Sequence, residues 1–186
     1  GRTTQLAVPR RAWSLPPMIT RRHVKGDAPS VAVYSDCEAY RYTLTRVWDP
    51  GARRVLFVML NPSTATEVQN DPTVERCERR ARTLGYGGFR VCNIFAYRAT
   101  DPKVMRAQAD PIGPDNDRAI AESVRWAADV VCAWGTHGAH RDRGPDVERL
   151  IRGLGVTPMH LGLSKDGHPR HPLYVAYATR PTPWGP

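Results

Sequence analysis

Short apolar runs recur along the chain. Residues 54–59 (RVLFVM), 89–96 (FRVCNIFA) and 130–134 (VVCAW) are nearly continuous apolar segments, and a weaker one follows at residues 158–161. Runs of this kind are typical of strands that are buried on both faces of a sheet. We therefore expect these four segments to form the centre of a β-sheet.

Between these runs, apolar residues recur every three or four positions. The segments 73–84, 115–128 and 145–154 show this spacing, which predicts three amphipathic helices. Because strands alternate with helices, we expect the strands to pair in parallel through right-handed crossovers.

Residues 31–34 and 40–48 are rich in β-branched and aromatic side chains, with a polar turn at residues 35–38 between them. This pattern predicts an N-terminal β-hairpin. The expected fold class is α/β: a three-layer sandwich with a mostly parallel central sheet and the hairpin added at its N-terminal side.

The first seventeen residues differ in composition from the rest. Residues 1–17 contain three arginines, three prolines and no acidic residue, and Met18 follows them. We expect a disordered or added tail ahead of a natural start at Met18. Residues 18–186 are enough for a single α/β domain with its own core.

The chain is basic, with 27 Lys and Arg against 18 Asp and Glu and a formal net charge of +9. This balance suits a polyanionic partner, of which nucleic acid is the commonest, or it only keeps the surface soluble. No apolar run is long enough for a membrane span, and no secretory signal is evident. Four cysteines without a C-x-x-C pair favour reduced thiols over a zinc ribbon or a disulfide framework. We therefore expect a cytoplasmic protein without membrane contact.

Polar segments follow the predicted strands at their carboxyl ends. In a parallel sheet these ends meet at one edge, and ligands bind in the crevice beyond it. We therefore expect a site at this edge. The candidate residues are Leu60, Asn61, Pro62, Ser63, Thr64, Asp71, Asn93, Tyr97, Arg98, Trp134, Gly135, Arg170 and His171.

Two asparagines are the main candidates for polar chemistry. The amide of Asn61 can hold a water through its oxygen and a substrate through its NH2 group, or Asn-Pro is only a turn signal. The adjoining hydroxyls of Ser63 and Thr64 favour a site, since an anion pocket requires such donors. Asn93 lies within an apolar strand, where an unpaired amide costs about 1–3 kcal/mol. It must therefore meet either a backbone group or a ligand such as a nucleobase.

Charged and imidazole groups near the same edge extend the list. Asp71 precedes a predicted helix and is either its N-cap, the simpler interpretation, or a general base that faces the crevice. His171, beside Arg170, is suited to donate a hydrogen bond to a carbonyl, a phosphate or a developing anion, or it is only exposed to solvent beside a turn. His137 and His140 have no cysteine or carboxylate at a spacing suited to metal, and no phosphate-binding glycine loop appears. We therefore expect no metal and no cofactor.

Aromatic side chains near these groups can stack on a nucleobase or belong to the core. Tyr97 is followed by Arg98, and Trp134 ends a predicted strand, so both are candidate stacking platforms. Tyr86 is a third.

Several short motifs occur together in this chain: LNPST at residues 60–64, NDPT at 70–73, NIFAYRATDP at 93–102 and RHPLY at 170–174. They resemble an uncharacterised bacterial and phage family of unknown function, over roughly residues 30–178. This resemblance implies no particular activity.

The order of the motifs is also distantly similar to that of the uracil-DNA glycosylase superfamily. There a strand ends in a G-x-N-P-G or G-x-D-P-Y turn, a second strand carries an asparagine, a third ends in L-G-x-x-A, and a last loop begins H-P-S. Residues 60–63, 91–98, 131–135 and 171–172 are similar to these motifs.

The glycosylase resemblance implies roles for three side chains. Asn61 would position the attacking water, Asn93 would hold the base, and His171 would hydrogen-bond its carbonyl as negative charge develops. The chain departs from the pattern at Met59, where the motif has glycine, and at Leu173, where it has a phosphate-gripping serine. Iron–sulfur cysteines have no match, so no cluster is expected.

We therefore expect hydrolysis or recognition of an N-glycosidic bond in a nucleic acid or nucleotide, including one with a modified base. The base would leave its stack and contact Asn93 and Tyr97, while Arg98 and Arg170 would contact phosphate. The alternative is a protein that binds a nucleotide or modified base without catalysis. An enzyme that acts on free nucleotides is a third hypothesis.

Overall fold

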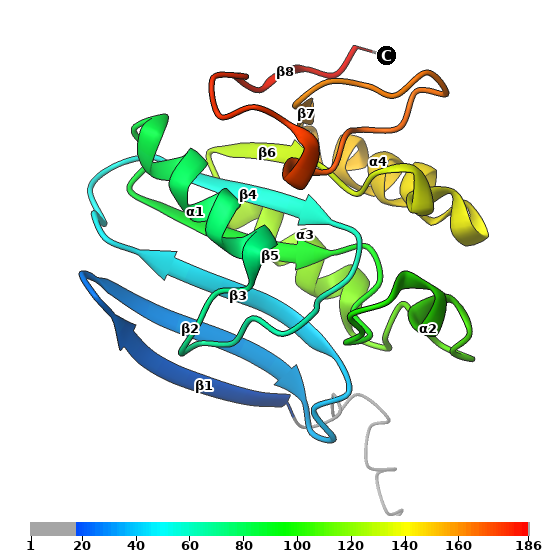
Figure 1. Cartoon of the computed structure of the whole chain (residues 1–186), viewed down its shortest axis with the longest axis horizontal. Coiled ribbons are helices and arrows are strands. Elements are labelled where there is room, and N and C mark those ends of the chain that lie inside the picture. Colours follow the sequence, from blue (N-terminus) through cyan, green and yellow to red (C-terminus); the bar gives the residue numbers. More distant parts are fainter. Residues whose placement is uncertain (1–17, 186) are drawn as a thin grey trace, which may run out of the picture.

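The computed structural model describes residues 18–185, which form one sheet of eight strands in the order β1-β2-β3-β5-β4-β6-β7-β8 (Figure 1). The expected tail at residues 1–17 lies outside the described residues. The strands are β1 (Met18–Lys25), β2 (Ala28–Ser35), β3 (Arg41–Val47), β4 (Arg54–Met59), β5 (Gly88–Asn93), β6 (Asp129–Cys132), β7 (Met159–His160) and β8 (Thr182–Pro183).

Helices cover both faces of this sheet. Helix α1 packs on one face, and α3 and α4 pack on the other (Figure 1). No helix between residues 18 and 185 is long and apolar enough to cross a membrane. The helices are α1 (Pro72–Thr83), α2 (Pro102–Arg106), α3 (Asn116–Trp126), α4 (Arg143–Gly153) and the 3-10 helices η1 (Thr136–Asp142) and η2 (Pro172–Tyr174).

The strand pairing corrects the predicted fold class. β4 pairs in parallel with β5 and β6, and β6 pairs in parallel with β7. The other four of the seven pairings, β1–β2, β2–β3, β3–β5 and β7–β8, are antiparallel. The expectation of a mostly parallel, uracil-DNA glycosylase-like sandwich is therefore wrong, because the sheet is mixed and mostly antiparallel.

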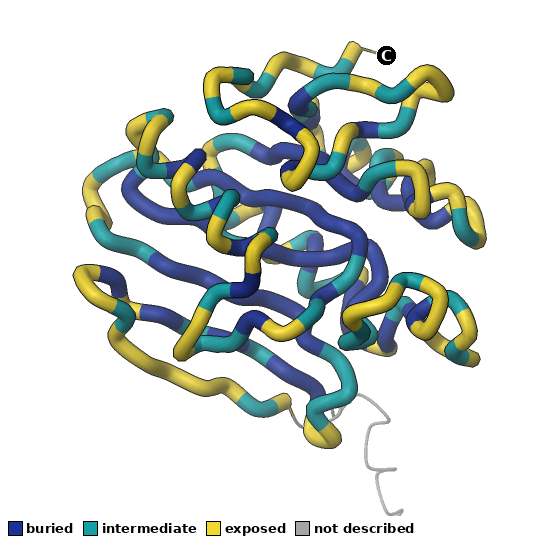
Figure 2. The backbone as a smooth tube through the Cα atoms, in the orientation of Figure 1, coloured by how far each residue is buried: buried dark blue, intermediate teal, exposed yellow. Residues whose placement is uncertain are grey.

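The N-terminal strands explain this difference. The predicted hairpin is present as β2 and β3, but β3 also pairs with β5 and so joins the main sheet. β1 adds an edge strand that the apolar pattern did not predict, since most of its residues are exposed (Figure 2). Its sequence, MITRRHVK, carries the charged side chains with which natural edge strands avoid further pairing.

Strand β4 takes part in both halves of the core. Val55, Phe57 and Met59 pack on the α1 side, whereas Leu56 and Val58 pack on the side of α3 and α4. All five are buried, and the central strands appear dark blue in Figure 2. Burying one such side chain contributes about 1.5–3 kcal/mol. This double burial fixes β4 and, with it, the position of the turn that follows Met59.

Trp134, just after β6, is the largest fully buried side chain among residues 18–185. Trp184 lies beside it, with the two ring centroids 5.9 Å apart. Two glycines contact its indole: a Cβ on Gly138 would lie 2.2 Å from Trp134 Cδ1, and a Cβ on Gly144 would lie 2.7 Å from Nε1. Only glycine at these positions lets η1 and α4 approach the end of β6 so closely.

We expect Gly138→Ala to destabilise the protein by about 1–3 kcal/mol, since the added methyl group must displace the Trp134 ring. Urea unfolding at constant pH measures the change. Gly153→Ala is the matched control, because a Cβ at that last residue of α4 meets no atom within 4 Å. Equal stability of the Gly138 variant and the wild type would contradict this view of the packing.

Candidate functional site

A cavity of about 800 Å³ lies beyond the carboxyl ends of the parallel strands. Its walls come from the turn after β4, the start of α1, the loop after β5, the segment after β6 and the loop between β7 and η2. This is the edge at which open α/β sheets bind ligands. The lining residues are Leu60, Asn61, Ser63, Thr64, Asp71, Pro72, Thr73, Ala99, Thr100, Pro102, Trp134, Gly135, Thr136, His137, Ser164, His168, Arg170, His171, Leu173 and Tyr174.

Nine of the thirteen residues predicted for the site line this cavity, and Pro62, Asn93, Tyr97 and Arg98 do not. The cavity brings together residues from separate parts of the chain; the roles predicted for them stay predictions. The nine are Leu60, Asn61, Ser63, Thr64, Asp71, Trp134, Gly135, Arg170 and His171.

The side-chain amide of Asn61 is held in one orientation. Its Nδ2 donates to the carbonyl of Ala99 at 2.8 Å and to that of Pro62 at 3.2 Å. The backbone N–H of Ala99 donates in turn to the Pro62 carbonyl, so the turn after β4 is tied to the loop after β5. No donor among residues 18–185 reaches Asn61 Oδ1, which leaves this oxygen as the acceptor for a ligand or a water.

His171 presents the complementary group. Burial lowers the pKa of this imidazole to about 4, against a smaller opposing effect of the Asp71 carboxylate, so the ring is neutral at pH 7. Its Nδ1 accepts a hydrogen bond from the backbone N–H of Leu173 at 3.3 Å. A neutral imidazole that accepts at Nδ1 carries its proton at Nε2. His171 is therefore a neutral Nε2–H donor beside the cavity.

Asp71 caps α1, as the simpler interpretation of the sequence predicted. One carboxylate oxygen accepts from the N–H of Val74 at 2.9 Å, and the other accepts from the N–H of Ala65 at 3.2 Å. The side chain lines the cavity but is only 8% exposed. Its two hydrogen bonds to backbone show an ordering role for Asp71 rather than that of a free base.

Two predicted ligand contacts instead support the β2–β3 turn. Tyr97 packs edge-to-face on Tyr40, with ring centroids 5.8 Å apart. Arg98 donates to the carbonyl of Glu38 at 3.2 Å and lies over the ring of Tyr34. The reason is the pairing of β3 with β5, which places the hairpin beside the chain that leaves β5.

Asn93 and Pro62 are also outside the lining. Asn93 ends β5 and is buried, and its backbone carbonyl accepts from Asn116 Nδ2 at 2.8 Å. No described group donates to its side-chain Oδ1. Pro62 is buried in the turn after β4, where its carbonyl accepts from Asn61.

The segment after β6 contributes backbone rather than a stacking surface. The Trp134 ring is 2% exposed and packed in the core, so it offers no face to a base. Gly135 has φ of 73°, a conformation that favours glycine, and its N–H donates to the Pro169 carbonyl at 2.8 Å. A Cβ at Gly135 would lie 3.5 Å from His171 Cβ. This glycine thus joins the end of β6 to the loop that carries His171.

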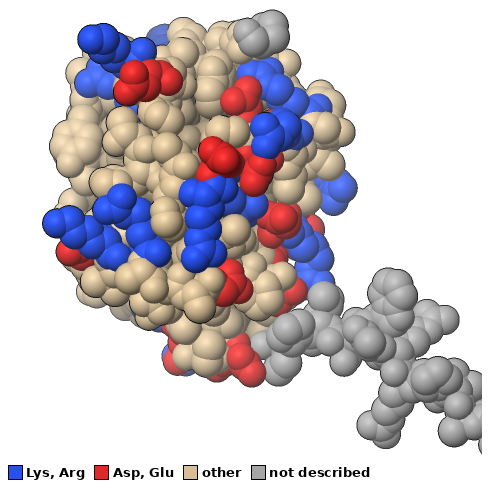
Figure 3. Space-filling view, turned by 90° about the vertical axis from the view of Figure 1, so that its right-hand side faces the viewer, with Lys and Arg blue, Asp and Glu red and all other residues tan. Residues whose placement is uncertain are grey.

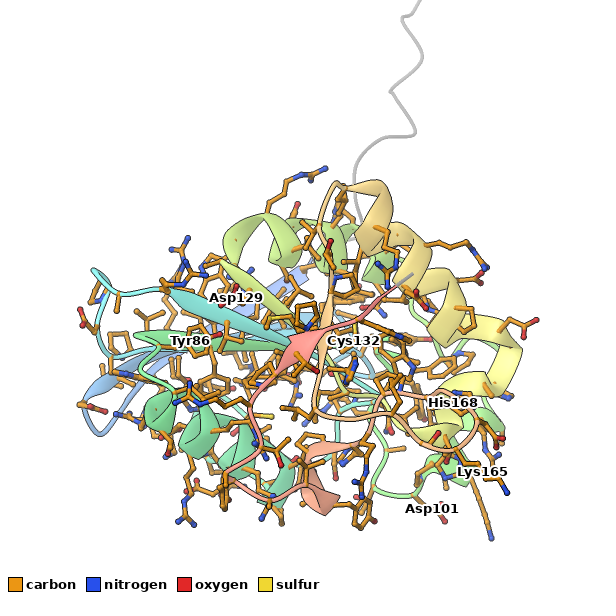
Figure 4. The ribbon with its side chains drawn as sticks, turned by 90° about the horizontal axis from the view of Figure 1, so that it is seen from above. Tyr86, Asp101, Asp129, Cys132, Lys165 and His168 are labelled. Atoms are coloured by element: carbon orange, nitrogen blue, oxygen red, sulfur yellow. The ribbon has the colours of Figure 1, made fainter. Side chains whose placement is uncertain are left out.

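Several lining residues were not predicted. Thr73, Thr100, Thr136, Ser164 and Tyr174 add hydroxyl groups, and all of them except Ser164 lie next to or within a motif noted in the sequence. His168 lies with Lys165 at one end of the sheet in Figure 4, and Tyr86 and Asp129 lie at the other.

Tyr86, a candidate stacking platform, is therefore remote from the cavity. Its hydroxyl donates to Asp129 at 2.6 Å.

The cavity itself is close to electrically neutral. Asp71 and Arg170 are the charged side chains among its lining residues, and they offset one another. On the side of the molecule where the parallel strands end, Lys and Arg are interspersed with Asp and Glu (Figure 3). Within residues 18–185, no three His, Cys, Asp or Glu side chains are grouped so that they could hold a metal ion.

Comparison with known protein families identifies the chain. Residues 41–173 match the family described as "Protein of unknown function (DUF1643)", and the chain belongs to that family. Comparisons with curated proteins and with solved structures found no significant match. The resemblance to an uncharacterised family is therefore confirmed, whereas no comparison supports a relation to uracil-DNA glycosylases.

The lowered pKa of His171 predicts a pH dependence of stability. Because folding lowers its pKa from 6.5 to about 4, the unfolded chain binds the proton first as the pH falls. This contribution is complete above pH 6.5 and is lost progressively towards pH 4, by about 3 kcal/mol in full. In urea unfolding, we expect the wild type to lose about 2–3 kcal/mol more than His171→Asn between pH 7 and pH 4.5.

Asparagine is the suitable replacement, since its Oδ1 can still accept from the Leu173 N–H. Other histidines titrate equally in both proteins and cancel from the difference. Parallel loss of stability in the two proteins would show that His171 is not buried in its neutral form.

Proposed function

We propose that the cavity binds a nucleobase-bearing ligand and hydrolyses its N-glycosidic bond. The ligand is a nucleotide, free or within a nucleic acid, and a modified base is included. The proposal rests on one observation: two groups with complementary chemistry line the same cavity. Asn61 Oδ1 is an oriented acceptor, and His171 Nε2–H is a neutral donor.

The reaction follows from these two groups. A water that donates to Asn61 Oδ1 adds its oxygen to the sugar C1′, and the bond from C1′ to the base nitrogen breaks. The base leaves with the bonding electrons, and the water gives up one proton to the base or to solvent. A hydrogen bond from His171 to the base carbonyl strengthens as negative charge develops there, so it stabilises the transition state more than the ground state.

The size and charge of the cavity support a base as the buried part of the ligand. About 800 Å³ lies within the usual range of small-molecule sites, roughly 300–1,000 Å³. Its near-neutral lining suits an uncharged polar ring better than a phosphate group. Arg170, which is exposed at the cavity, is the lining side chain suited to a phosphate outside it.

One observation favours a second candidate, binding of a nucleotide or modified base without catalysis. Asp71 is the carboxylate among the lining residues, and both of its oxygens already accept backbone hydrogen bonds. A site without a free base can hold a ligand and leave its bond intact.

Release of free base from nucleosides, nucleotides and single- and double-stranded oligonucleotides with different bases tests the proposal, with chromatography as the readout. We expect Asn61→Ala to slow release about 100-fold through loss of water positioning. His171→Asn should slow it about 10²–10³-fold, since a donor to the developing charge is lost. Binding of the same substrates should change much less.

Gln69→Ala is the matched control, because this exposed amide lies outside the cavity lining. If no substrate releases its base, but binding is retained and depends on Asn61, the protein is a binding protein and not a hydrolase. A steep loss of affinity with added salt would indicate a nucleic acid rather than a free nucleotide.

A further inference from the structure

Arg76 of α1 spans the short helix η2. Its Nε donates to the carbonyl of Pro172 at 2.9 Å, and its Nη2 donates to that of Val175 at 2.6 Å. Pro172 begins η2 and Val175 is its C-cap, so one planar guanidinium holds both ends of the turn. Arginine suits this task because its donors form a rigid fork.

Arg80, one turn further along α1, holds the chain that follows η2. Its guanidinium donates to the carbonyls of Val175 at 3.1 Å, Ala176 at 3.1 Å and Thr179 at 2.7 Å. Arg80 is fully buried, and no carboxylate among residues 18–185 pairs with it. Three charge-assisted hydrogen bonds therefore take the place of a counter-ion. They also provide donors for backbone carbonyls that accept no hydrogen bond from a neighbouring strand or within a helix.

His171 immediately precedes the held segment, as the N-cap of η2. Within η2, the N–H of Leu173 is the group that donates to His171 Nδ1 and so places the ring proton on Nε2. The direction of that N–H depends on the shape of the turn, whose two ends are fixed by Arg76.

We propose that Arg76 and Arg80 are positioning residues that keep His171 oriented beside the cavity by binding the backbone of residues 172–179. This inference rests on the function proposed above for His171. It gives two of the arginines of α1 a structural role at the site.

The imidazole of His171 reports on its own orientation. In ¹⁵N-labelled protein, long-range ¹H–¹⁵N spectra distinguish the two neutral tautomers and follow protonation. We expect the wild type to show a single Nε2–H form with a pKa of about 4. In Arg76→Ala and Arg80→Ala, the freed segment should expose the ring, mix the tautomers and make protonation at least about tenfold easier.

Arg79→Ala is the matched control. Arg79 lies over the ring of Tyr177, with its Cζ 4.8 Å from the ring centroid. It is exposed and donates to none of the carbonyls of residues 172–179. The Arg79→Ala substitution therefore removes a positive charge and a stacking contact from the same helix, and it leaves the hydrogen bonds to the carbonyls of residues 172–179 intact. We expect its His171 spectrum to match the wild type.

Arg76 is only partly buried, so its alanine variant decides the matter even if Arg80→Ala does not fold. A folded Arg76→Ala protein with the tautomer and pKa of the wild type overturns the proposal. So does an Arg79→Ala protein that changes as much as Arg76→Ala.

The spectra need no substrate, which separates this inference from the proposed reaction. If base release is observed, Arg76→Ala should lower kcat about 10–100-fold with little change in KM, as for a displaced catalytic group. If no base is released and the spectra change as expected, the hydrolase fails and the positioning of His171 stands.

Discussion

The parallel pairing of β4 with β5 and β6 is the constraint on which the site depends. β4 has apolar side chains on both faces, so it can lie only in the middle of the sheet, with helices on either side. Because β4 pairs in parallel with β5 and β6, the chain leaves all three strands at the same edge of the sheet. The cavity at that edge follows from the topology, whatever chemistry its residues carry.

The loops that follow these strands lie outside the hydrogen-bond ladders of the sheet. Buried arginines donate hydrogen bonds to several of their backbone carbonyls. Arg41 donates to the carbonyl of Ala65, and Arg143 donates to that of Ile94. Arg46 donates to the next carbonyl of the first of these loops, that of Thr66, and Arg80 donates to that of Thr179; all four arginines are at most 4% exposed. The formal charge of +9 therefore overstates the positive charge that the surface offers to a polyanion.

The sequence predicted the parts of the fold that rest on burial. β4 has the predicted bounds, and α1, α3 and α4 begin within two residues of the predicted starts. β1 and the short helix α2 were missed, since an exposed edge strand and a five-residue helix carry no apolar period. The pairing of β3 with β5 could not be predicted either, because an apolar run identifies a strand but not the strand beside which it lies. That pairing removes Tyr97 and Arg98 from the cavity and makes them supports of the hairpin.

The relation between Asn61 and His171 depends on α1. Asp71, at the start of this helix, accepts from the N–H of Ala65 and so ties the helix to the loop that carries Asn61. Further along the same helix, Arg76 holds the turn that carries His171. Helix α1 is thus hydrogen-bonded both to the loop that carries the acceptor and to the turn beside the donor. A carboxylate engaged in this way orders the site rather than acting as a base, which is why the proposed chemistry uses an amide oxygen and a neutral imidazole.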